Sequence, residues 1–330
     1  MARTRIALCP HLSVEHYRGG EKWATALANR LAADGVDVRD VLDSEVPYRE
    51  AWHHDLSEFD TAYVFYNPLS EVFFSGGGTR IAGIHSWAFV SPKLFEAHYG
   101  VVPTAVKLLY RAIGARDLGR FDAVHTVTPA FDSPHPNTIH VPNFVDIERF
   151  RPDRRERADE FTVLTTAAHI REKGWDTVQA VAERLDPEIQ VVTTGEGAGK
   201  IEGLGFLDED ELADAYARAH VVLHPARVDT DSMVINEACA SGTPVVTTPL
   251  ATHVRENDAI LHAETPRGMA HALGLLRAEW RHDDGYDERC RRAREEGEAH
   301  GFDEIYPRLK DLLTSPPTVE TGTTRTEVRV

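Results

Sequence analysis

The chain is short of cysteine, of lysine and of long apolar runs. Its three cysteines, Cys9, Cys239 and Cys290, are far apart and form no C-x-x-C pair, which argues against metal clusters, redox motifs and a disulfide scaffold. No apolar run approaches the roughly 18 residues of a membrane-spanning helix. The apolar run at residues 6–9 ends at Pro10, which is too soon for a signal peptide. A reducing cytoplasm is therefore the expected compartment.

Positive charge is also scarce. The 36 lysines and arginines face 53 aspartates and glutamates, which gives a formal net charge of −17, and only six of the basic residues are lysines. This balance argues against a nucleic-acid partner, because polynucleotide binding needs positive charge. Two origins of the acidity stay open. A lysine-poor acidic surface keeps a protein hydrated at high salt, as in halophiles, and a GC-rich genome produces a similar composition.

What is present is an alternation of short apolar runs and helical patterns, which predicts β-α-β units with parallel sheets. At about 150 residues per domain, the 330 residues predict two domains. The predicted strands are 5–9, 36–42, 61–66, 80–85, 123–127 and 138–141, then 161–167, 189–194, 201–206, 220–224, 244–248 and 259–262. The predicted helices are 21–33, 174–184, 209–219, 232–240 and 302–313.

The two series divide the chain into two similar α/β domains. We expect the first at residues 1–148, completed by a returning helix near 300–313, and the second at residues 149–299. Residues 314–330 are rich in threonine, proline and charge, and we expect a disordered tail there. Two such Rossmann-like domains would face each other across a cleft lined by the carboxyl ends of both sheets, which suits an enzyme with two substrates.

Several strand-to-helix turns carry candidate ligand-binding residues. Gly19 and Gly20 precede the first helix and would let backbone amides approach a phosphate, although a tight turn without a ligand is the alternative. Arg171 and Lys173 follow a strand and suit a diphosphate, although they could equally be solvated surface cations. The Gly195-Glu196-Gly197 turn follows the next strand, again at a carboxyl end.

The segment 228–246 is the most informative. Asp229 lies in the loop before a helix that Asp231 or Ser232 would cap, and Glu237 lies inside that helix, where it could accept hydrogen bonds from a ribose diol. The backbone amides of Ser232, Met233 and Val234 lie at the N-terminus of this helix, where they would suit a phosphate.

Two of the candidates have competing explanations. Residues 229–231 spell D-x-D, a pattern that holds a metal in some sugar transferases, but its place before a capped helix favours capping and substrate contact. His85 ends a strand in the sequence IAGIHSWAF and could bind a sugar hydroxyl, or it could be a structural histidine. The other histidines form no H-E-x-x-H pattern.

Taken together, these segments resemble a retaining glycosyltransferase of family 4, which has the two-domain GT-B fold. The resemblance covers nearly the whole chain before the tail. It is carried by Gly19 and Gly20, VPNFVDIERFRP at 141–152, REKG at 171–174, the Gly-Glu-Gly turn at 195–197, YARAHVVLHPA at 216–226, and the acidic pair separated by seven residues that ends in ASGTPVV.

The resemblance implies roles for single residues. Lys173 would bind the donor diphosphate, together with Arg171 and the turn at Gly195 and Glu196, and Glu237 would bind the ribose. The amides of residues 232–234 would meet the phosphates, and Gly19 and Gly20 would lie beneath the phosphate near the acceptor. His85 and Asp229 would contact the donor sugar and form the catalytic pair. The first domain would then take the acceptor and the second the donor.

The chain departs from the family pattern in three features. The first glutamate of the family is Asp229 here, and the aromatic-glycine pair that often follows is Asp231-Ser232. The arginine usually found five residues before the lysine is Ala168. Arg171 would have to supply the missing charge, or diphosphate binding would weaken.

The implied reaction is hexosyl transfer from a nucleotide-diphosphate sugar to an acceptor hydroxyl with retention, in glycan, glycolipid or surface-polysaccharide assembly. No obligatory metal or cofactor is implied. A non-catalytic sugar-nucleotide-binding relative and another GT-B enzyme, such as a sugar-nucleotide epimerase, are the alternatives. Residues 93–120 mix basic and apolar residues and would give peripheral contact with the inner face of a membrane and a lipid-linked acceptor, or would form a core-facing helix with a solvated basic side.

Overall fold

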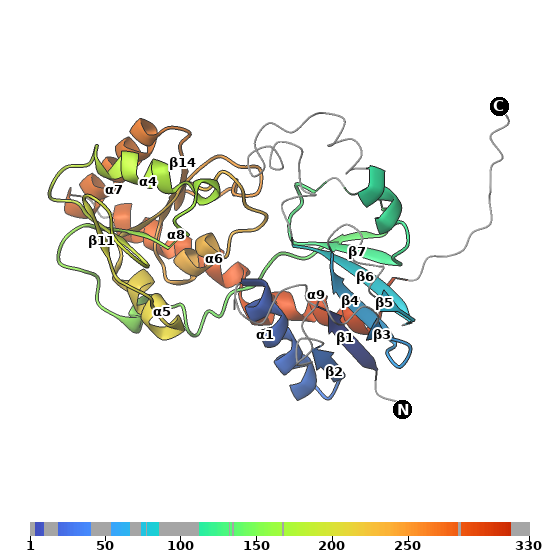
Figure 1. Cartoon of the computed structure of the whole chain (residues 1–330). Helices are drawn as coiled ribbons and strands as arrows, with labels where there is room; N and C mark the ends of the chain where they lie inside the picture. Colours follow the sequence, from blue (N-terminus) through green and yellow to red (C-terminus); the bar gives the residue numbers. More distant parts are fainter. Residues whose placement is uncertain are drawn as a thin grey trace.

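The described part of the chain contains two six-stranded parallel sheets, each with its own helices (Figure 1). The structure is a computed structural model of the full chain. It describes residues 4–9, 19–40, 54–66, 74–76, 78–85, 112–131, 133, 135–166, 168–282 and 285–317. Two parallel α/β sheets are what the alternating sequence pattern predicts, so the predicted α/β class is confirmed.

The first sheet has the strand order β2-β1-β4-β6-β7-β8. Its strands are β1 (Arg5–Cys9), β2 (Asp37–Asp40), β4 (Thr61–Phe65), β6 (Thr79–Ile84), β7 (Ala123–Thr126) and β8 (Thr138–His140). Helix α1 (Gly19–Ala33) packs on one face through Trp23, Leu27 and Leu31. A separate two-stranded ladder pairs β3 (His54–Asp55) with β5 (Phe74–Ser75).

The second sheet has the order β11-β10-β9-β12-β13-β14. Its strands are β9 (Thr162–Thr165), β10 (Gln190–Thr193), β11 (Ile201–Gly203), β12 (Val221–His224), β13 (Val245–Thr247) and β14 (Ile260–His262). One face is covered by α5 (Glu209–Arg218), α6 (Met233–Ala240) and α8 (Gly285–Ala299), and the other by α4 (Trp175–Ala182) and α7 (Pro266–His282). Short 3-10 helices lie at Pro152–Arg154 (η4) and Arg171–Lys173 (η5).

The alternation of side chains along each strand explains the two covered faces. In β12, Val222 packs on the α6 side, whereas Val221 and Leu223 pack on the α4 side. All four residues of β12 are buried, as expected for a parallel strand with helices on both faces. Continuous apolar runs therefore predict these strands well. Most of the observed strands are one to three residues shorter than predicted.

Helix α9 (Phe302–Thr314) leaves the second domain and packs against the first sheet (Figure 1). Ile305, Leu309 and Leu312 join the core beneath β1 and β4. The Lys310 ammonium lies 2.6 Å from Asp34, which follows α1. The chain therefore crosses between the two sheets twice, before β9 and before α9.

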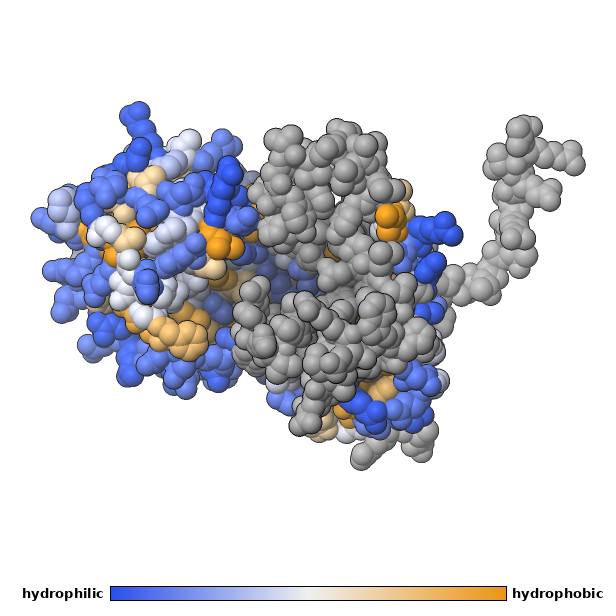
Figure 2. Space-filling model, viewed as in Figure 1, coloured by the Kyte–Doolittle hydropathy of each residue, from blue (hydrophilic) through white to orange (hydrophobic). Residues whose placement is uncertain are grey.

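Two predicted regions fall mainly outside the description. Most of the basic and apolar segment 93–120 is not described, and neither are residues 318–330 of the predicted tail. Among the described residues, none of the helices combines the length and the apolar composition that crossing a bilayer requires. Where the surface of the second domain is coloured in Figure 2, it is largely hydrophilic with scattered apolar side chains.

Candidate active site

A pocket of about 280 Å³ lies between the two sheets and takes its walls from both. The first domain contributes Trp23 from α1, Phe65 from the end of β4, His85 after β6 and Asn143. The second contributes Lys173 and the loop that leads into α6. The residues of this loop that line the pocket are Asp229, Thr230, Asp231, Ser232, Met233 and Val234. Six sequence-predicted site residues, His85, Lys173, Asp229, Ser232, Met233 and Val234, therefore meet in one place.

A glycine turn positions Lys173. Gly174 has φ +79°, and a Cβ there would overlap the carbonyl oxygen of Pro225, so only glycine lets the two loops approach this closely. The Glu172 carbonyl accepts hydrogen bonds from the amides of Arg227 (2.8 Å) and Val228 (3.2 Å). The loop after β9 is thereby joined to the loop after β12, and the Lys173 ammonium is held beside the pocket.

Asp229 is the most heavily contacted carboxylate of the pocket. Its Oδ1 lies 3.4 Å from the Lys173 ammonium, and its Oδ2 lies 2.9 Å from Nε2 of His224 and 3.5 Å from Nε2 of His253. Burial opposes ionisation, but Lys173 and the two histidines hold the pKa of Asp229 well below its ordinary value. Burial also lowers the pKa of His224 to about 4, so His224 is neutral at physiological pH and hydrogen-bonds Asp229.

The N-terminus of α6 offers free amides to the pocket. Ser232 is the N-cap, and its hydroxyl accepts a hydrogen bond from the Ile235 amide at 3.4 Å. The Met233 and Val234 amides come first in the helix, where no preceding carbonyl is available to accept from them. Both residues line the pocket. Such amides and the helix dipole favour an anion, with a phosphate as the natural fit.

Asp231 joins the two domains. Its Oδ2 accepts from the Asn143 amide at 2.6 Å, its carbonyl accepts from the Asn143 side chain at 3.0 Å, and Arg255 lies 3.4 Å from Oδ1. Burial, only partly offset by Arg255, raises the pKa of Asp231 to about 6. Both carboxylate oxygens of Asp231 already have partners, so residues 229–231 do not present two free carboxylates to one metal ion. The cap of α6 is Ser232 and not Asp231.

His85 is held in one tautomer by a buried relay. His125 Nε2 donates to the Val141 carbonyl (2.8 Å), so its Nδ1 accepts from the Tyr63 hydroxyl. Tyr63 must then accept from His85 Nε2, 2.8 Å away. Gly83 makes room for this relay, because a Cβ there would overlap the Tyr63 ring. His85 is left with an unprotonated Nδ1 that can accept a hydrogen bond.

Both relay histidines are neutral. Burial, reinforced by neighbouring His125, lowers the pKa of His85 well below its ordinary value, and burial lowers the pKa of His125 to about 4. The His85 ring also stacks on Phe65 at 4.5 Å and meets Trp23 edge-on at 4.8 Å. These contacts fix its position at the pocket wall.

Glu237 lies in the second turn of α6, outside the lining of the pocket. Its Oε2 accepts from the Tyr216 hydroxyl at 2.9 Å. Burial raises the pKa of Glu237 to about 7, and the hydrogen bond from Tyr216 only partly offsets this. The Glu237 carboxyl is thus about half ionised near pH 7.

The remaining candidates do not line the pocket in the described part of the chain. Gly19 and Gly20 open α1, so they belong to the helix and not to the loop before it. Arg171 is exposed in η5, and Ala168, where the resemblance leads one to expect an arginine, is exposed as well. Gly195 adopts φ +85° and bridges to Gly205, and Glu196 is exposed.

Sequence reasoning missed five residues that shape this site. The sequence shows Trp23 only as part of the apolar face of a helix. In the structure, Trp23 lines the pocket, and its buried Nε1 has no hydrogen-bond partner among the described residues. Tyr63 lies in no motif, and the motif at residues 141–152 that contains Asn143 assigns this residue no role. His224 and His253 lie 29 positions apart, and only the parallel order of β12 and β13 brings them together.

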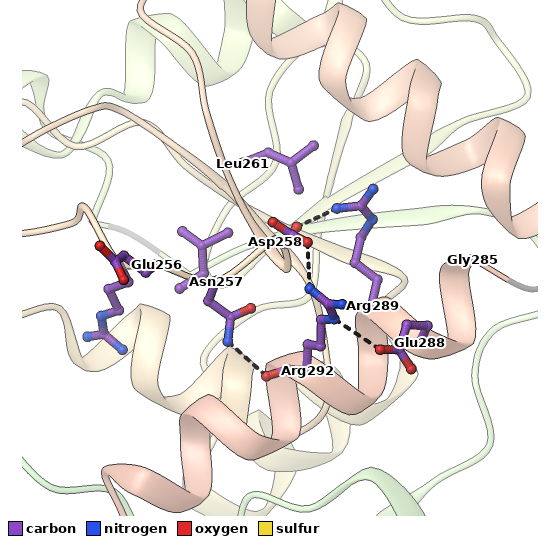
Figure 3. Close-up of a pocket in the computed structure, with 10 residues that line it drawn as sticks. Glu256, Asn257, Asp258, Leu261, Gly285, Glu288, Arg289 and Arg292 are labelled. Atoms are coloured by element: carbon purple, nitrogen blue, oxygen red, sulfur yellow. Dashed lines mark hydrogen bonds and ion pairs between the residues drawn. The ribbon is translucent and has the colours of Figure 1, made fainter.

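A second pocket, of about 720 Å³, lies beside β14 and α8 and is less suited to an anion (Figure 3). Arg289 pairs with Glu279 at 2.6 Å, and Arg292 pairs with Asp258 and, at 3.0 Å, with Glu288. Carboxylates therefore already neutralise these two arginines. Lys173 also pairs with a carboxylate, Asp229, but the pocket that it lines contains the N-terminus of α6 as well.

Comparison with known families gives a match to the second domain. The family model described as Glycosyl transferases group 1 matches residues 157–278, from just before β9 into α7. A curated relative, the phosphatidylinositol N-acetylglucosaminyltransferase gpi3 subunit of Schizosaccharomyces pombe, is 27% identical over 127 residues. That match covers 33% of this chain and 28% of the relative, so the chain matches little more than a quarter of that protein's length.

Solved structures match nearly the whole chain. Sucrose-phosphate synthase from Thermosynechococcus elongatus has a TM-score of 0.72 at 18% identity, with 94% of this chain and 98% of that chain covered. Anabaena HepE in complex with UDP and glucose has a TM-score of 0.70 at 14% identity, with 95% and 100% covered. At these identities the likeness concerns the fold, which is GT-B.

Proposed function

We propose that this chain, which has the GT-B fold and whose residues 157–278 match the Glycosyl transferases group 1 model, is a glycosyltransferase that transfers a sugar from a nucleotide diphosphate to an acceptor hydroxyl with retention of the anomeric configuration. The observation that carries the proposal is the pocket between the two sheets. It joins one lysine, the free amides of α6 and a hydrogen-bond-accepting histidine.

In this proposal, the diphosphate lies between the Lys173 ammonium and the amides of Met233 and Val234. These groups neutralise the charge that develops on the leaving nucleotide, with no metal required for that task. Lys173 is paired with Asp229 in the structure, and a bound diphosphate would compete for it. Because position 168 is an alanine and not an arginine, Lys173 must neutralise a larger share of the charge on the leaving diphosphate.

The donor sugar lies against His85 and Asp229. His85 Nδ1 accepts a hydrogen bond from a sugar hydroxyl, since its Nε2 is already committed to Tyr63. Glu237 accepts from the ribose, and Gly19, Gly20, Arg171 and the turn at residues 195–196 complete the donor side. Closure of the two domains over the donor limits hydrolysis by excluding water.

We further propose that the first domain, residues 1–148 with α9, holds the acceptor, and that the second, residues 149–299, holds the donor. The name of the S. pombe relative points to a lipid acceptor. Residues 93–120 would bring the protein to an anionic membrane surface. Co-sedimentation with anionic vesicles at low salt tests this, and a protein that stays in the supernatant contradicts it.

A donor panel tests the transfer itself. The protein is incubated with UDP-, GDP- and ADP-sugars, starting from UDP-glucose because HepE is seen with UDP and glucose, with and without extracted lipid or glycan acceptors. We expect nucleotide release with at least one donor, lost in Lys173→Ala and Glu237→Ala. Lys200→Ala is the matched control, because this lysine is exposed and pairs with Glu183. NMR of the product anomer tests retention.

Two results would contradict sugar transfer. Tight donor binding without turnover, with acceptors supplied, would indicate a non-catalytic relative. Interconversion of the donor sugar without transfer would indicate an epimerase.

A further inference from the structure

The strongest unassigned feature is a buried cluster behind Asp229. His224 ends β12, Asp229 lies in the loop that follows, and His253 lies in the loop after β13. The ligand atoms of the three side chains lie within 4.8 Å of one another. We propose that His224, Asp229 and His253 form a binding site for a divalent transition metal ion of the zinc class.

The hydrogen bonds of His253 leave a lone pair aimed at the cluster. The Thr247 hydroxyl donates to the His224 carbonyl at 2.7 Å, so it can only accept from His253 Nδ1, 2.9 Å away. In the neutral imidazole, Nε2 is then unprotonated. This atom is fully buried, has no hydrogen-bond partner among the described residues, and lies 3.5 Å from the Asp229 carboxylate. A lone pair that faces a carboxylate in a buried site is repelled unless a proton or a metal ion lies between the two groups, and a metal ion would bind both.

The spacing of the three groups suits a tetrahedral ion. Metal bonds of 2.0–2.1 Å to nitrogen and oxygen place neighbouring ligand atoms about 3.3 Å apart. Asp229 Oδ2 lies 2.9 Å from His224 Nε2 and 3.5 Å from His253 Nε2, on either side of that value. Nε2 of His224 donates to Asp229 in the structure, so the ion would replace this proton, and the neutral imidazole would then carry its proton on Nδ1. Two imidazoles and one carboxylate are a common ligand set for zinc. Lys173 contacts the other oxygen, Oδ1, so it does not occupy the metal-facing one.

Neighbouring contacts hold the ligands in place. Thr252 donates to the Asp229 carbonyl at 3.1 Å, and His262 Nε2 contacts the His253 carbonyl at 3.2 Å. The Ser232 hydroxyl lies 3.1 Å from His224 Nε2. The first two contacts hold the backbone of Asp229 and His253, and the hydrogen bond from His253 Nδ1 to Thr247 is of the kind that orients metal-binding histidines. The site uses Asp229 but not Asp231, so it differs from a D-x-D site, and it goes beyond the proposed transfer.

Cobalt(II) absorption tests the site directly. The purified full chain, stripped with a chelator, is titrated with Co²⁺ in the absence of any donor. We expect intense visible d–d bands of a tetrahedral ion that saturate at one Co²⁺ per chain and are displaced by Zn²⁺. His253→Ala and Asp229→Asn should each weaken Co²⁺ binding by more than about tenfold. His271→Ala removes an exposed histidine of α7 and should bind like the unmodified protein.

Circular dichroism of each variant separates loss of the site from loss of the fold. Asp229→Asn keeps the shape of the side chain, so a folded variant without the bands supports the site. Absence of one-to-one Co²⁺ binding by the unmodified protein overturns the proposal, as does survival of the bands in folded Asp229→Asn. Loss of the bands in Asp231→Asn with retention in Asp229→Asn would indicate a different site and would also overturn it.

Discussion

At the scale of single residues, the site depends on side chains whose neighbours set their protonation. Glu237 and Asp229 are both buried carboxyls, yet their pKa values move in opposite directions. Asp229 has a lysine and two imidazoles beside it, whereas the Tyr216 hydroxyl and the charge of Lys22 offset the burial of Glu237 only in part. Asp229 is therefore charged at neutral pH, and Glu237 is half protonated near pH 7.

Glu237→Gln should change how stability depends on pH. The pKa of Glu237 is raised from 4.5 to about 7 in the folded protein, so between these values the folded state holds more protons than the unfolded chain. Its contribution to the free energy of unfolding falls as pH rises through this window and is constant above it. The variant keeps an acceptor for Tyr216 without the charge, so above pH 7 it should gain stability on the order of 2–3 kcal/mol.

Urea unfolding of both proteins at pH 5 and pH 8 measures this difference. Glu264→Gln, which removes an exposed carboxylate, is the control. A Glu237→Gln variant with the same pH dependence as the unmodified protein would show that the carboxyl is not desolvated. The variant should also bind donor more weakly at pH 8, where the carboxylate is the better acceptor for a ribose diol.

Tyr63→Phe should allow His85 to adopt either of its two neutral tautomers. The substitution removes the hydroxyl that accepts from His85 Nε2 and donates to His125 Nδ1, and it leaves both buried. We expect kcat/KM to fall about tenfold, on the order of one lost hydrogen bond at the sugar. Nitrogen-15 NMR of the imidazoles should show His85 leaving its single tautomer.

Tyr66→Phe is the matched control for this change. It also removes a buried hydroxyl of the same domain, but this hydroxyl donates to Asp117 at 2.9 Å and to the Gly114 carbonyl at 3.4 Å. If both variants lose the same activity and the His85 signals do not change, the role of Tyr63 is purely structural and the prediction is wrong.

At the scale of elements, the turns after the parallel strands build the pocket. Each of its polar groups follows a strand or opens a helix: His85 after β6, Lys173 after β9, Asp229 after β12 and Ser232 before α6. Because parallel strands end at one edge of a sheet, these groups converge without being close in sequence.

Gly174→Ala should destabilise the protein more than backbone strain alone would. The residue has φ +79°, and a Cβ would also overlap the Pro225 carbonyl oxygen. We expect a loss of stability of about 1–3 kcal/mol, together with weaker donor binding because Lys173 moves. Gly205→Ala is the control, since Gly205 has φ +76° and open space around it.

Thermal unfolding and donor titration of the two glycine variants separate the two effects. The difference between them isolates the close approach to Pro225, because the backbone strain is similar. Equal losses of stability would show that the loop at 225 moves aside, and normal donor binding by Gly174→Ala would argue against Lys173 as a donor ligand.

At the scale of the whole molecule, the two domains are joined by paired chain crossings and by polar contacts. The Val145 amide donates to the His300 carbonyl at 2.8 Å, and the Phe302 amide donates to Val145 at 3.0 Å. Asn143 holds Asp231 across the pocket. The pocket is thus part of the domain junction, and any relative movement of the domains changes its shape.

The net charge of −17 predicts a salt response. If repulsion among surface carboxylates outweighs the exposed ion pairs, screening stabilises the fold. We expect the Tm to rise between 0.1 and 2 M KCl, as for a protein adapted to high salt. Sucrose of equal osmolarity controls for general exclusion of the solute. A Tm that falls with KCl would indicate that the ion pairs dominate and would leave genome composition as the source of the acidity.

The sequence by itself determined the class of fold and most of the elements that form the two large sheets. Continuous apolar runs such as Val221-Val222-Leu223 specify buried parallel strands, and a serine before an apolar helix with Gly242 behind it marks α6 at both ends. These signals are local, so they can be recognised along the chain. Helices α7 and α8 were not predicted, because their many charged residues obscure the apolar face.

Only the tertiary structure decided how the site is assembled. The partners of Asp229, Asp231 and His85 come from distant loops, and no spacing in the sequence announces His253 or Tyr63 as their neighbours. Burial sets the protonation of these groups, and burial is a property of the packed sheets and helices. The sequence thus specified which chemical groups stand at the strand ends, and the folding of two sheets around one pocket decided which of them meet.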